Sequence, residues 1–194
     1  MVRITGRRWM IVTRILKHCL FVVAAIIVAA PAAAEVKITF HSREFGATFP
    51  HAFVSLKGRL DATGEVIDTG YGFTAKTISP AILMGSVGGQ LQVETRSYIE
   101  NSQRHFTITV DDEGYRTLMA VVDKWRNAKQ PSYNLNRANC VHFVGEMAQA
   151  AGLNVTFDPK LMKKPRSFLV SVKAANEARV EPALGLDGTQ AAAP

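Results

Sequence analysis

Short runs of alternating apolar and polar residues occupy the chain between residues 36 and 110, and this spacing is typical of half-buried β-strands. The turn-forming residues Asp61-Ala62-Thr63-Gly64 predict a hairpin between the second and third runs. Residues 78–89 contain Pro80 and several glycines, so we predict a surface loop there, with apolar side chains suited to lining a pocket. The strands that we predict from the alternating runs are 36–40, 51–57, 65–73, 91–98 and 105–110.

Two stretches with the periodicity of a helix follow these strands. Asp111 can cap the first helix, whose apolar face consists of Tyr115, Leu118, Val122 and Trp125, and Pro131 follows it. Asn139 can cap the second helix, and Gly152 marks its end. The apolar face of this second helix begins with a cysteine and consists of Cys140, Phe143, Val144, Met147, Ala148 and Ala151.

Residues 1–34 have the composition of an export signal. Five basic and no acidic residues are followed by the apolar run 19–30 and by Pro31-Ala32-Ala33-Ala34, which predicts cleavage after Ala34 and a periplasmic or secreted protein. The run is shorter than the roughly 20 residues that span a bilayer. The alternative is an uncleaved anchor in the inner membrane that begins near Trp9.

This signal changes the interpretation of the net charge. The whole chain has a formal charge of +7 from 23 basic and 16 acidic residues, and without the five basic residues of 1–34 the excess is only two. We therefore predict no nucleic-acid partner, and any membrane contact would come only from an uncleaved signal. The basic cluster of Lys160, Lys163, Lys164 and Arg166 is interpreted as a solvated stretch. We predict one domain over residues 35–173 and a poorly ordered tail over residues 174–194.

Cys140 is the only cysteine that remains after removal of the signal, because Cys19 lies within it. A lone thiol in an oxidising compartment is either a candidate nucleophile or a buried cysteine that acts as a small apolar side chain. The first turn of a helix favours a thiolate, because unpaired N–H groups and the positive end of the helix dipole lie there. The same N–H groups suit the oxyanion that forms when a thiolate attacks a carbonyl.

A cysteine nucleophile needs a base, which is usually a histidine. His51 opens a predicted strand after Pro50 and is the candidate base, against the alternative of a structural histidine. His142 follows Cys140 by two positions and shares a helix face with Glu146, which predicts a supporting role. The chain has no HExxH or CxxC spacing, so we predict no metal and no cofactor.

Two motifs resemble a known group of enzymes. Tyr133-Asn134-Leu135, followed by Asn139-Cys140-Val141-His142-Phe143-Val144, is similar to the cysteine motif of circularly permuted papain-like hydrolases. This group includes the lecithin:retinol acyltransferase-like proteins and the PPPDE-like peptidases. In those families the catalytic histidine opens a strand and precedes the cysteine, which is the order of His51 and Cys140 here. In the related NlpC/P60 cell-wall peptidases the cysteine comes first.

The resemblance implies an α+β fold of the permuted papain-like (NlpC/P60) type, in which an antiparallel sheet packs against a helix with the cysteine at its N-terminus. It also implies an exported thiol hydrolase, an amidase or peptidase, with a Cys140–His51 dyad and a thioester intermediate. Asn139 and His142 would support the cysteine. The residue that orients His51 would come from the returning strand, which offers Asp68, Thr69, Tyr71 and Thr74, unless the dyad needs no third member.

For an exported protein, the analogy with the NlpC/P60 enzymes implies a peptide bond of peptidoglycan as the substrate. Two alternatives remain. One is an acyltransferase or lipid-ester hydrolase of the lecithin:retinol acyltransferase-like type. The other is a non-catalytic module that binds a peptide or a lipid on the same fold.

Overall fold

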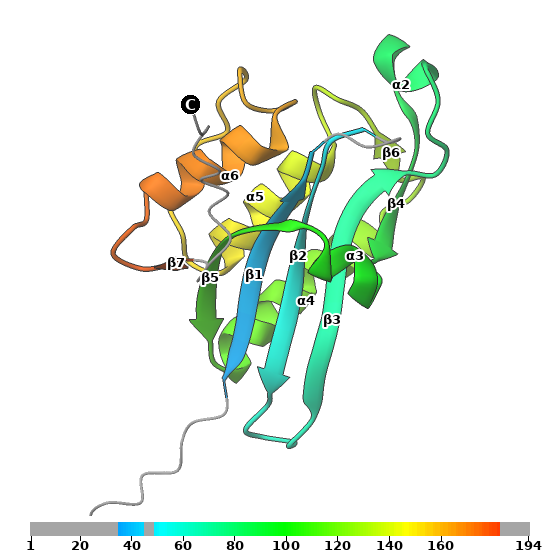
Figure 1. Ribbon diagram of the computed structural model, residues 1–194. Helices are drawn as coiled ribbons and strands as arrows, with labels where there is room; N and C mark the ends of the chain where they lie inside the picture. The colour runs from blue at the N-terminus through cyan, green and yellow to red at the C-terminus, as the bar shows by residue number, and fades with distance from the viewer. Residues whose placement is uncertain (1–34, 45–48, 183–194) are drawn as a thin grey trace, which may run out of the picture. The chain divides into compact units, whose positions relative to one another are not determined.

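Seven β-strands form one antiparallel sheet with the order β6-β4-β3-β2-β1-β5-β7 (Figure 1). The computed structural model describes residues 35–44 and 49–182, so the predicted export signal and residues 183–194 lie outside the described residues. The α+β class predicted from the sequence is confirmed. The strands are β1 Val36–Arg43, β2 His51–Arg59, β3 Val66–Ala75, β4 Val87–Val93, β5 Gln103–Val110, β6 Ser132–Tyr133 and β7 Glu181–Pro182.

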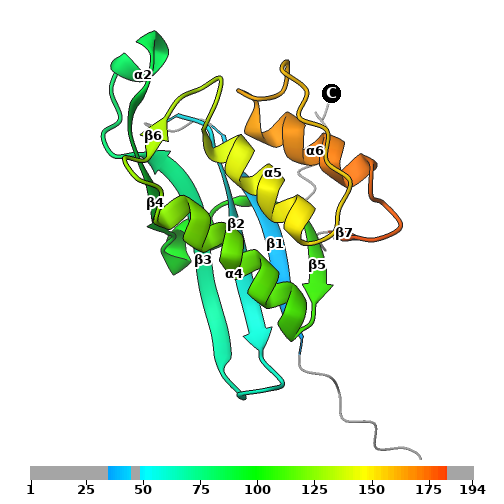
Figure 2. The same cartoon turned by 180° about the vertical axis from the view of Figure 1, so that it is seen from behind.

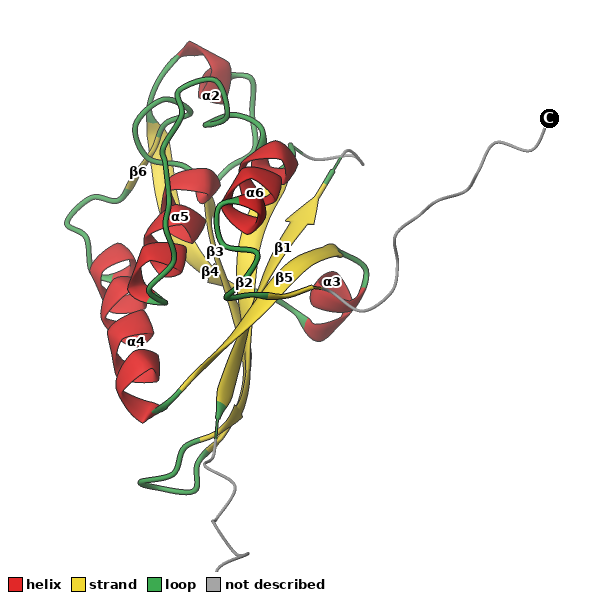
Figure 3. Ribbon diagram, turned by 90° about the vertical axis from the view of Figure 1, so that its left-hand side faces the viewer, coloured by secondary structure: helices red, strands yellow, loops and turns green. Residues whose placement is uncertain are grey.

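The helices lie on both faces of this sheet. The larger ones, α4 (Asp112–Arg126), α5 (Cys140–Ala150) and α6 (Pro165–Ala174), cover one face, which we call the helical face (Figures 2 and 3). The short helix α3 (Arg96–Glu100) lies on the opposite face, which we call the α3 face. Helix α2 (Ala81–Met84) lies at the end of the sheet near β6.

The core fills the space between the helical face of the sheet and the helices α4, α5 and α6 that cover it. Alternate residues of β1 point into it, and Val36, Ile38 and Phe40 are fully buried. Trp125 of α4 joins the two layers, because its ring packs edge-on against Phe73 of β3 at 4.5 Å and against Phe143 of α5 at 5.7 Å. Burial of these apolar residues on one face of each element stabilises the two-layer arrangement.

The predicted hairpin between β2 and β3 is confirmed. Gly64 adopts a positive φ of 70° in its turn, and its N–H donates to the carbonyl of Leu60. The first turn of α4 also holds this turn, because the Asp112 carboxylate accepts hydrogen bonds of 2.9 Å from the backbone N–H groups of Asp61 and Ala62. The cap of α4 is Asp111, as predicted.

Two segments differ from their predicted structure. The predicted strand 91–98 ends at Val93. Thr95 then caps helix α3, because its hydroxyl accepts from the N–H of Tyr98. The predicted loop at 78–89 contains α2 and the first residues of β4, which begins at Val87.

The C-terminal part of the domain has more structure than the sequence predicted. Helix α6 was not predicted, and it starts with Pro165 at its first turn and buries Phe168, Leu169 and Val172. The predicted tail begins at residue 174, yet Asn176 and Val180 are buried and β7 pairs with β5. Asn176 is held by hydrogen bonds to Asn154. Among residues 35–44 and 49–182, no helix combines the length and apolar character needed to cross a bilayer.

Candidate functional site

The candidate site lies where strands β2 and β3 separate. Their pairing stops at Val54 and Tyr71. Beyond this point His51 and Ala52 stay paired with β1, while residues 72–75 of β3 pair with β4. The sheet therefore opens between β2 and β3 at this end. Through this opening, Cys140 of α5 on the helical face meets His51, whose ring stacks on Phe53 near Tyr98 of α3.

Helix α5 begins at Cys140, and Asn139 is its cap as predicted. The Asn139 side-chain oxygen accepts from the N–H groups of Val141 and His142, at 2.8 and 3.2 Å. Its amide nitrogen donates to the carbonyls of Leu135 and Met162, at 2.8 and 2.7 Å. All the polar atoms of this buried side chain are thus used, and they fix the first turn of α5 at a defined place.

His142 supports the same turn. Its Nδ1 accepts from the backbone N–H of Asn139 at 3.3 Å, which completes a reciprocal capping box. The sequence placed His142 on one face with Glu146, but the Glu146 carboxylate instead accepts from Lys124 and Trp125 of α4, at 2.8 and 2.9 Å. Burial lowers the pKa of His142, which favours the neutral ring that can accept a hydrogen bond.

Cys140 is buried, and the residue is only 3% exposed. Its thiol lies within the site. It hydrogen-bonds with the ring of His51, with the backbone N–H of Ala52 and with the hydroxyl of Tyr133. Tyr133 belongs to β6 and lies close to the cysteine because β6 pairs with β4 at the edge of the sheet. Cys140 is free of any disulfide.

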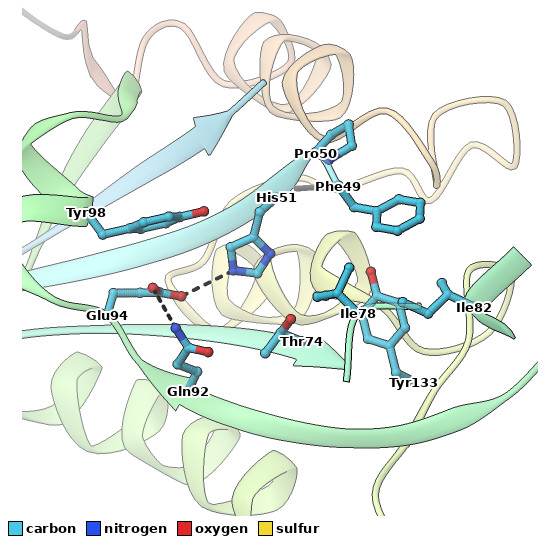
Figure 4. A pocket seen from close by; sticks show the side chains of 10 residues that line it. All are labelled: Phe49, Pro50, His51, Thr74, Ile78, Ile82, Gln92, Glu94, Tyr98 and Tyr133. Carbon is cyan, nitrogen blue, oxygen red and sulfur yellow. Dashed lines mark hydrogen bonds and ion pairs between the residues drawn. The ribbon is translucent and has the colours of Figure 1, made fainter. Parts of the chain in front are cut away.

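Glu94 is the orienting partner of His51. Its Oε1 lies 3.2 Å from Nε2 of His51, and its Oε2 accepts from Gln92 at 3.4 Å (Figure 4). The Glu94 side chain is 1% exposed and that of His51 is 13% exposed. A carboxylate as buried as this needs a charged or hydrogen-bonding partner, and His51 supplies it.

Electrostatics favour a charged histidine and a charged cysteine. Burial alone would lower the pKa of His51, but hydrogen bonds to Cys140 and Glu94 and the charges of both raise that pKa from 6.5 to about 9. Burial would raise the pKa of the Cys140 thiol, but the hydrogen bonds and charge of His51, with the donors Ala52 and Tyr133, lower it overall. Both shifts act in the same direction, and they favour a thiolate–imidazolium pair over the neutral thiol and neutral ring.

Gly72 of β3 makes the approach of His51 to Glu94 sterically possible. A Cβ atom at this position would lie 2.5 Å from both Oε1 of Glu94 and Nε2 of His51. Any larger residue would push the two side chains apart.

His51 lines a cleft of about 190 Å³, and Figure 4 shows the side chains that surround it. One wall is polar and is formed by His51, Glu94, Gln92 and Thr74. The other is apolar and includes part of the predicted pocket-lining segment 78–89. It consists of Phe49, Pro50, Ile78 and Ile82, with the rings of Tyr98 and Tyr133 at the ends.

The structure brings together four of the six predicted site residues. His51 and Cys140 meet, and Asn139 and His142 hold the helix start. Thr69 and Tyr71 do not belong to the site. Thr69 pairs with Leu56 away from the opening, and Tyr71 packs its ring under the guanidinium of Arg126. Within the described part of the chain, no group of three or more His, Cys, Asp or Glu side chains could hold a metal ion.

Two site residues were missed by the sequence analysis, Glu94 and Tyr133. Glu94 falls within the predicted strand 91–98, and its local sequence carries no signal that it meets His51. Tyr133 was noticed only as part of the cysteine motif. Burial, and then the charge and hydrogen bond of Cys140, raise the pKa of Tyr133 well above its ordinary value, so its hydroxyl stays protonated and can donate.

Comparisons with known proteins gave no match for this chain to a protein-family model, to a curated protein or to a solved structure.

Replacing Glu94 by glutamine should lower the pKa of His51 well below 9, because the amide keeps the shape of the carboxylate and removes its charge. An NMR titration of the His51 ring measures this pKa. Glu146→Gln is the matched control and should leave the His51 pKa unchanged, since Glu146 contacts Lys124 and Trp125 instead. An unaltered His51 pKa in Glu94→Gln would contradict the assignment of Glu94.

Proposed function

We propose that the protein is a cysteine hydrolase of the permuted papain-like class, with Cys140 as nucleophile, His51 as acid and base, and Glu94 as the residue that orients His51. The observation that carries this proposal is the buried chain of contacts from the Glu94 carboxylate through the His51 ring to the Cys140 thiol. Nucleophile, base and orienting acid in hydrogen-bonding sequence form the arrangement that activates a side chain for attack.

The two ring nitrogens of His51 contact different partners and have different roles. Nε2 faces Glu94, which leaves Nδ1 to exchange a proton with the thiol. The carboxylate fixes the orientation of the ring and stabilises its positive charge. Cys140 is therefore held as a thiolate before the substrate arrives.

Two donors near the sulfur suit the oxyanion of a tetrahedral intermediate. The cap of α5 uses the N–H groups of Val141 and His142, and it leaves the N–H of Cys140 itself for the substrate. The protonated hydroxyl of Tyr133 is the second donor. Both groups are fixed before the reaction, which is the condition for efficient stabilisation of the developing charge.

The reaction then proceeds in two halves. The thiolate forms a bond to the carbonyl carbon, and the carbonyl electron pair moves to the oxygen. The intermediate collapses to a thioester as the bond to the leaving amine or alcohol breaks, and the His51 imidazolium gives that group its proton. Neutral His51 next takes a proton from water, the resulting hydroxide attacks the thioester, and the acid product and the thiolate are released.

The cleft supports a substrate whose acyl part is apolar, because Phe49, Ile78 and Ile82 form one wall opposite His51 (Figure 4). This favours the acyl-ester or acyl-amide type of substrate. A cell-wall peptide, which the predicted export suggests, is the second candidate. The chemistry at Cys140 is the same for both.

Cys140→Ala should abolish turnover of a p-nitrophenyl ester, and His51→Ala should reduce it by about 10²–10⁴-fold, the usual contribution of a general acid–base. On an acyl anilide, whose amine must be protonated before it leaves, the wild-type rate should fall as pH rises through about 9, because the imidazolium that supplies this proton is lost there. Steady-state kinetics over a pH series measure both effects.

His142→Ala is the matched control for His51→Ala. It should lower the free energy of unfolding by about 1 kcal/mol, since it removes half of a capping box, and it should retain part of the activity. Folded Cys140→Ala protein with full activity would reject the nucleophile. Folded His51→Ala protein with full activity would reject the base. If the wild-type protein binds a peptide or a lipid and turns over no substrate, it is a binding module and the hydrolase proposal is rejected.

Substrate preference depends on the apolar wall. The protein should hydrolyse an octanoyl ester faster than an acetyl ester, and Ile78→Asn should reduce that preference, because it places a polar group against the acyl chain. Leu83→Asn changes an equally apolar residue of α2 that does not line the cleft, and it should leave the ratio of kcat/KM values unchanged. Equal rates for both esters in the wild type would favour the cell-wall peptide.

A further inference from the structure

Helix α2 and the residues before it carry exposed apolar side chains at one end of the domain. Leu83 and Met84 are 68% and 91% exposed, and Ile78 is 49% exposed. We call residues 78–84 the α2 tip. Figures 1 and 2 show α2 beyond one end of the sheet and the hairpin between β2 and β3 at the opposite end. Single exposed apolar residues are common on protein surfaces, but three within one short segment indicate a contact surface.

Two hydrogen bonds connect the α2 tip with the coil between α5 and α6. The Asn134 side chain donates to the hydroxyl of Ser86, two residues after α2, at 3.0 Å. The Asn139 side chain donates to the carbonyl of Met162, in that coil, at 2.7 Å. Because Asn134 and Asn139 bound one short turn before α5, the tip, the turn and the coil lie at the same end of the domain (Figure 1).

The segments around the α2 tip are basic. Residues 76–86, 134–139 and 158–164 contain five basic side chains and one acidic side chain, that of Asp158, and the end of β1 adds one residue of each sign. None of the five basic side chains makes an ion pair with another described residue. The five basic residues, all of them exposed, are Lys76, Arg137, Lys160, Lys163 and Lys164.

An apolar tip with cations around it suits an anionic lipid surface. Apolar side chains enter the boundary of the acyl region, while lysine and arginine side chains are attracted to the phosphate groups. A stable protein interface uses about 20–30 residues on each side. A reversible lipid contact needs only a small apolar area together with electrostatic attraction. The excess of one charge sign around the tip therefore favours a lipid surface over a second folded protein.

We propose that the α2 tip docks on an anionic phospholipid bilayer, with Leu83 and Met84 in the apolar layer and with the five basic residues at the phosphate groups. Docking brings the cleft beside the lipid, because Ile78 and Ile82 of the same segment line it. Leu83 and Met84 do not line the cleft, so the docking side chains are distinct from its apolar wall. This contact does not depend on the reaction at Cys140, and it is additional to any attachment through the predicted export signal.

Amide hydrogen exchange of the full chain tests this contact. We expect phosphatidylglycerol vesicles to slow the exchange of residues 78–86, and we expect phosphatidylcholine vesicles of the same size to slow it much less. The exchange of residues 60–66, in the hairpin at the opposite end, should not change with either lipid. Comparing the two ends of one molecule separates docking from attachment through the export signal, which does not select the α2 tip.

The apolar side chains are tested by the double variant Leu83→Asn/Met84→Asn, which should lose the slowed exchange of residues 78–86. Val66→Asn is the matched control, because Val66 is an apolar residue of the opposite end with a similar exposure of 64%. This control should retain the slowed exchange. All three positions are exposed, so these variants should fold.

The cations are tested by the double variant Lys163→Gln/Lys164→Gln. It should lose most of the slowed exchange, because each basic residue at an anionic lipid surface contributes about fivefold in affinity. Lys57→Gln/Arg116→Gln removes two exposed basic residues outside the three segments, and it should retain the slowed exchange.

Three outcomes would overturn the proposal. The first is unchanged exchange of residues 78–86 with phosphatidylglycerol vesicles. The second is equal slowing with both lipids, because the cations would then contribute nothing. The third is slowing without vesicles as the concentration of the chain rises, because a second copy would then cover the tip. Cys140→Ala should dock as the wild type does, which separates a failure of docking from a failure of the hydrolase proposal.

Discussion

The ring of His51 lies between a buried carboxylate and a buried thiol, and the candidate site depends on this arrangement. Isolated in the same surroundings, His51 and Cys140 would each avoid the charged form, because burial opposes ionisation. Together they reverse that preference, and the pKa of His51 rises while that of Cys140 falls. Removing any one of them would leave a charge without its partner. The reactivity proposed for Cys140 is therefore a property of the three residues and not of the cysteine alone.

The fold makes this contact possible by opening its own sheet. His51 and Glu94 belong to the α3 face and Cys140 to the helical face, and a fully paired sheet would separate them. The loss of pairing between β2 and β3 beyond Val54 provides the opening, and the N–H of Ala52 is thereby available for the sulfur. Gly72 leaves room for the histidine and the carboxylate to meet. Backbone geometry and side-chain chemistry are thus coupled at one end of the sheet.

Local signals were sufficient for the parts of the site that lie within one element. Asn139 before an apolar helical stripe predicted both the helix and the position of Cys140, and the strand that starts at His51 followed from alternation. Glu94 could not be found in this way, because its meeting with His51 depends on the register of β3 and β4 and on the end of β4 at Val93. Thr69 and Tyr71 were expected because the partner was sought on the strand that pairs with β2, and the structure places Glu94 beside His51 instead. Helix α6 was missed because its basic residues concealed the apolar spacing of Phe168, Leu169 and Val172.

The central claim is that Cys140 is a thiolate at neutral pH because His51 is charged beside it. The direct test is the thiolate absorbance of the full chain as a function of pH, in a Cys19→Ser background that leaves one thiol, with and without His51→Gln. We predict that the thiolate of the His51 protein persists to pH values well below the ordinary cysteine pKa of 9.0, and that His51→Gln raises the midpoint above that of the parent. Titration of both proteins at the same midpoint, at or above the ordinary value, would contradict this account.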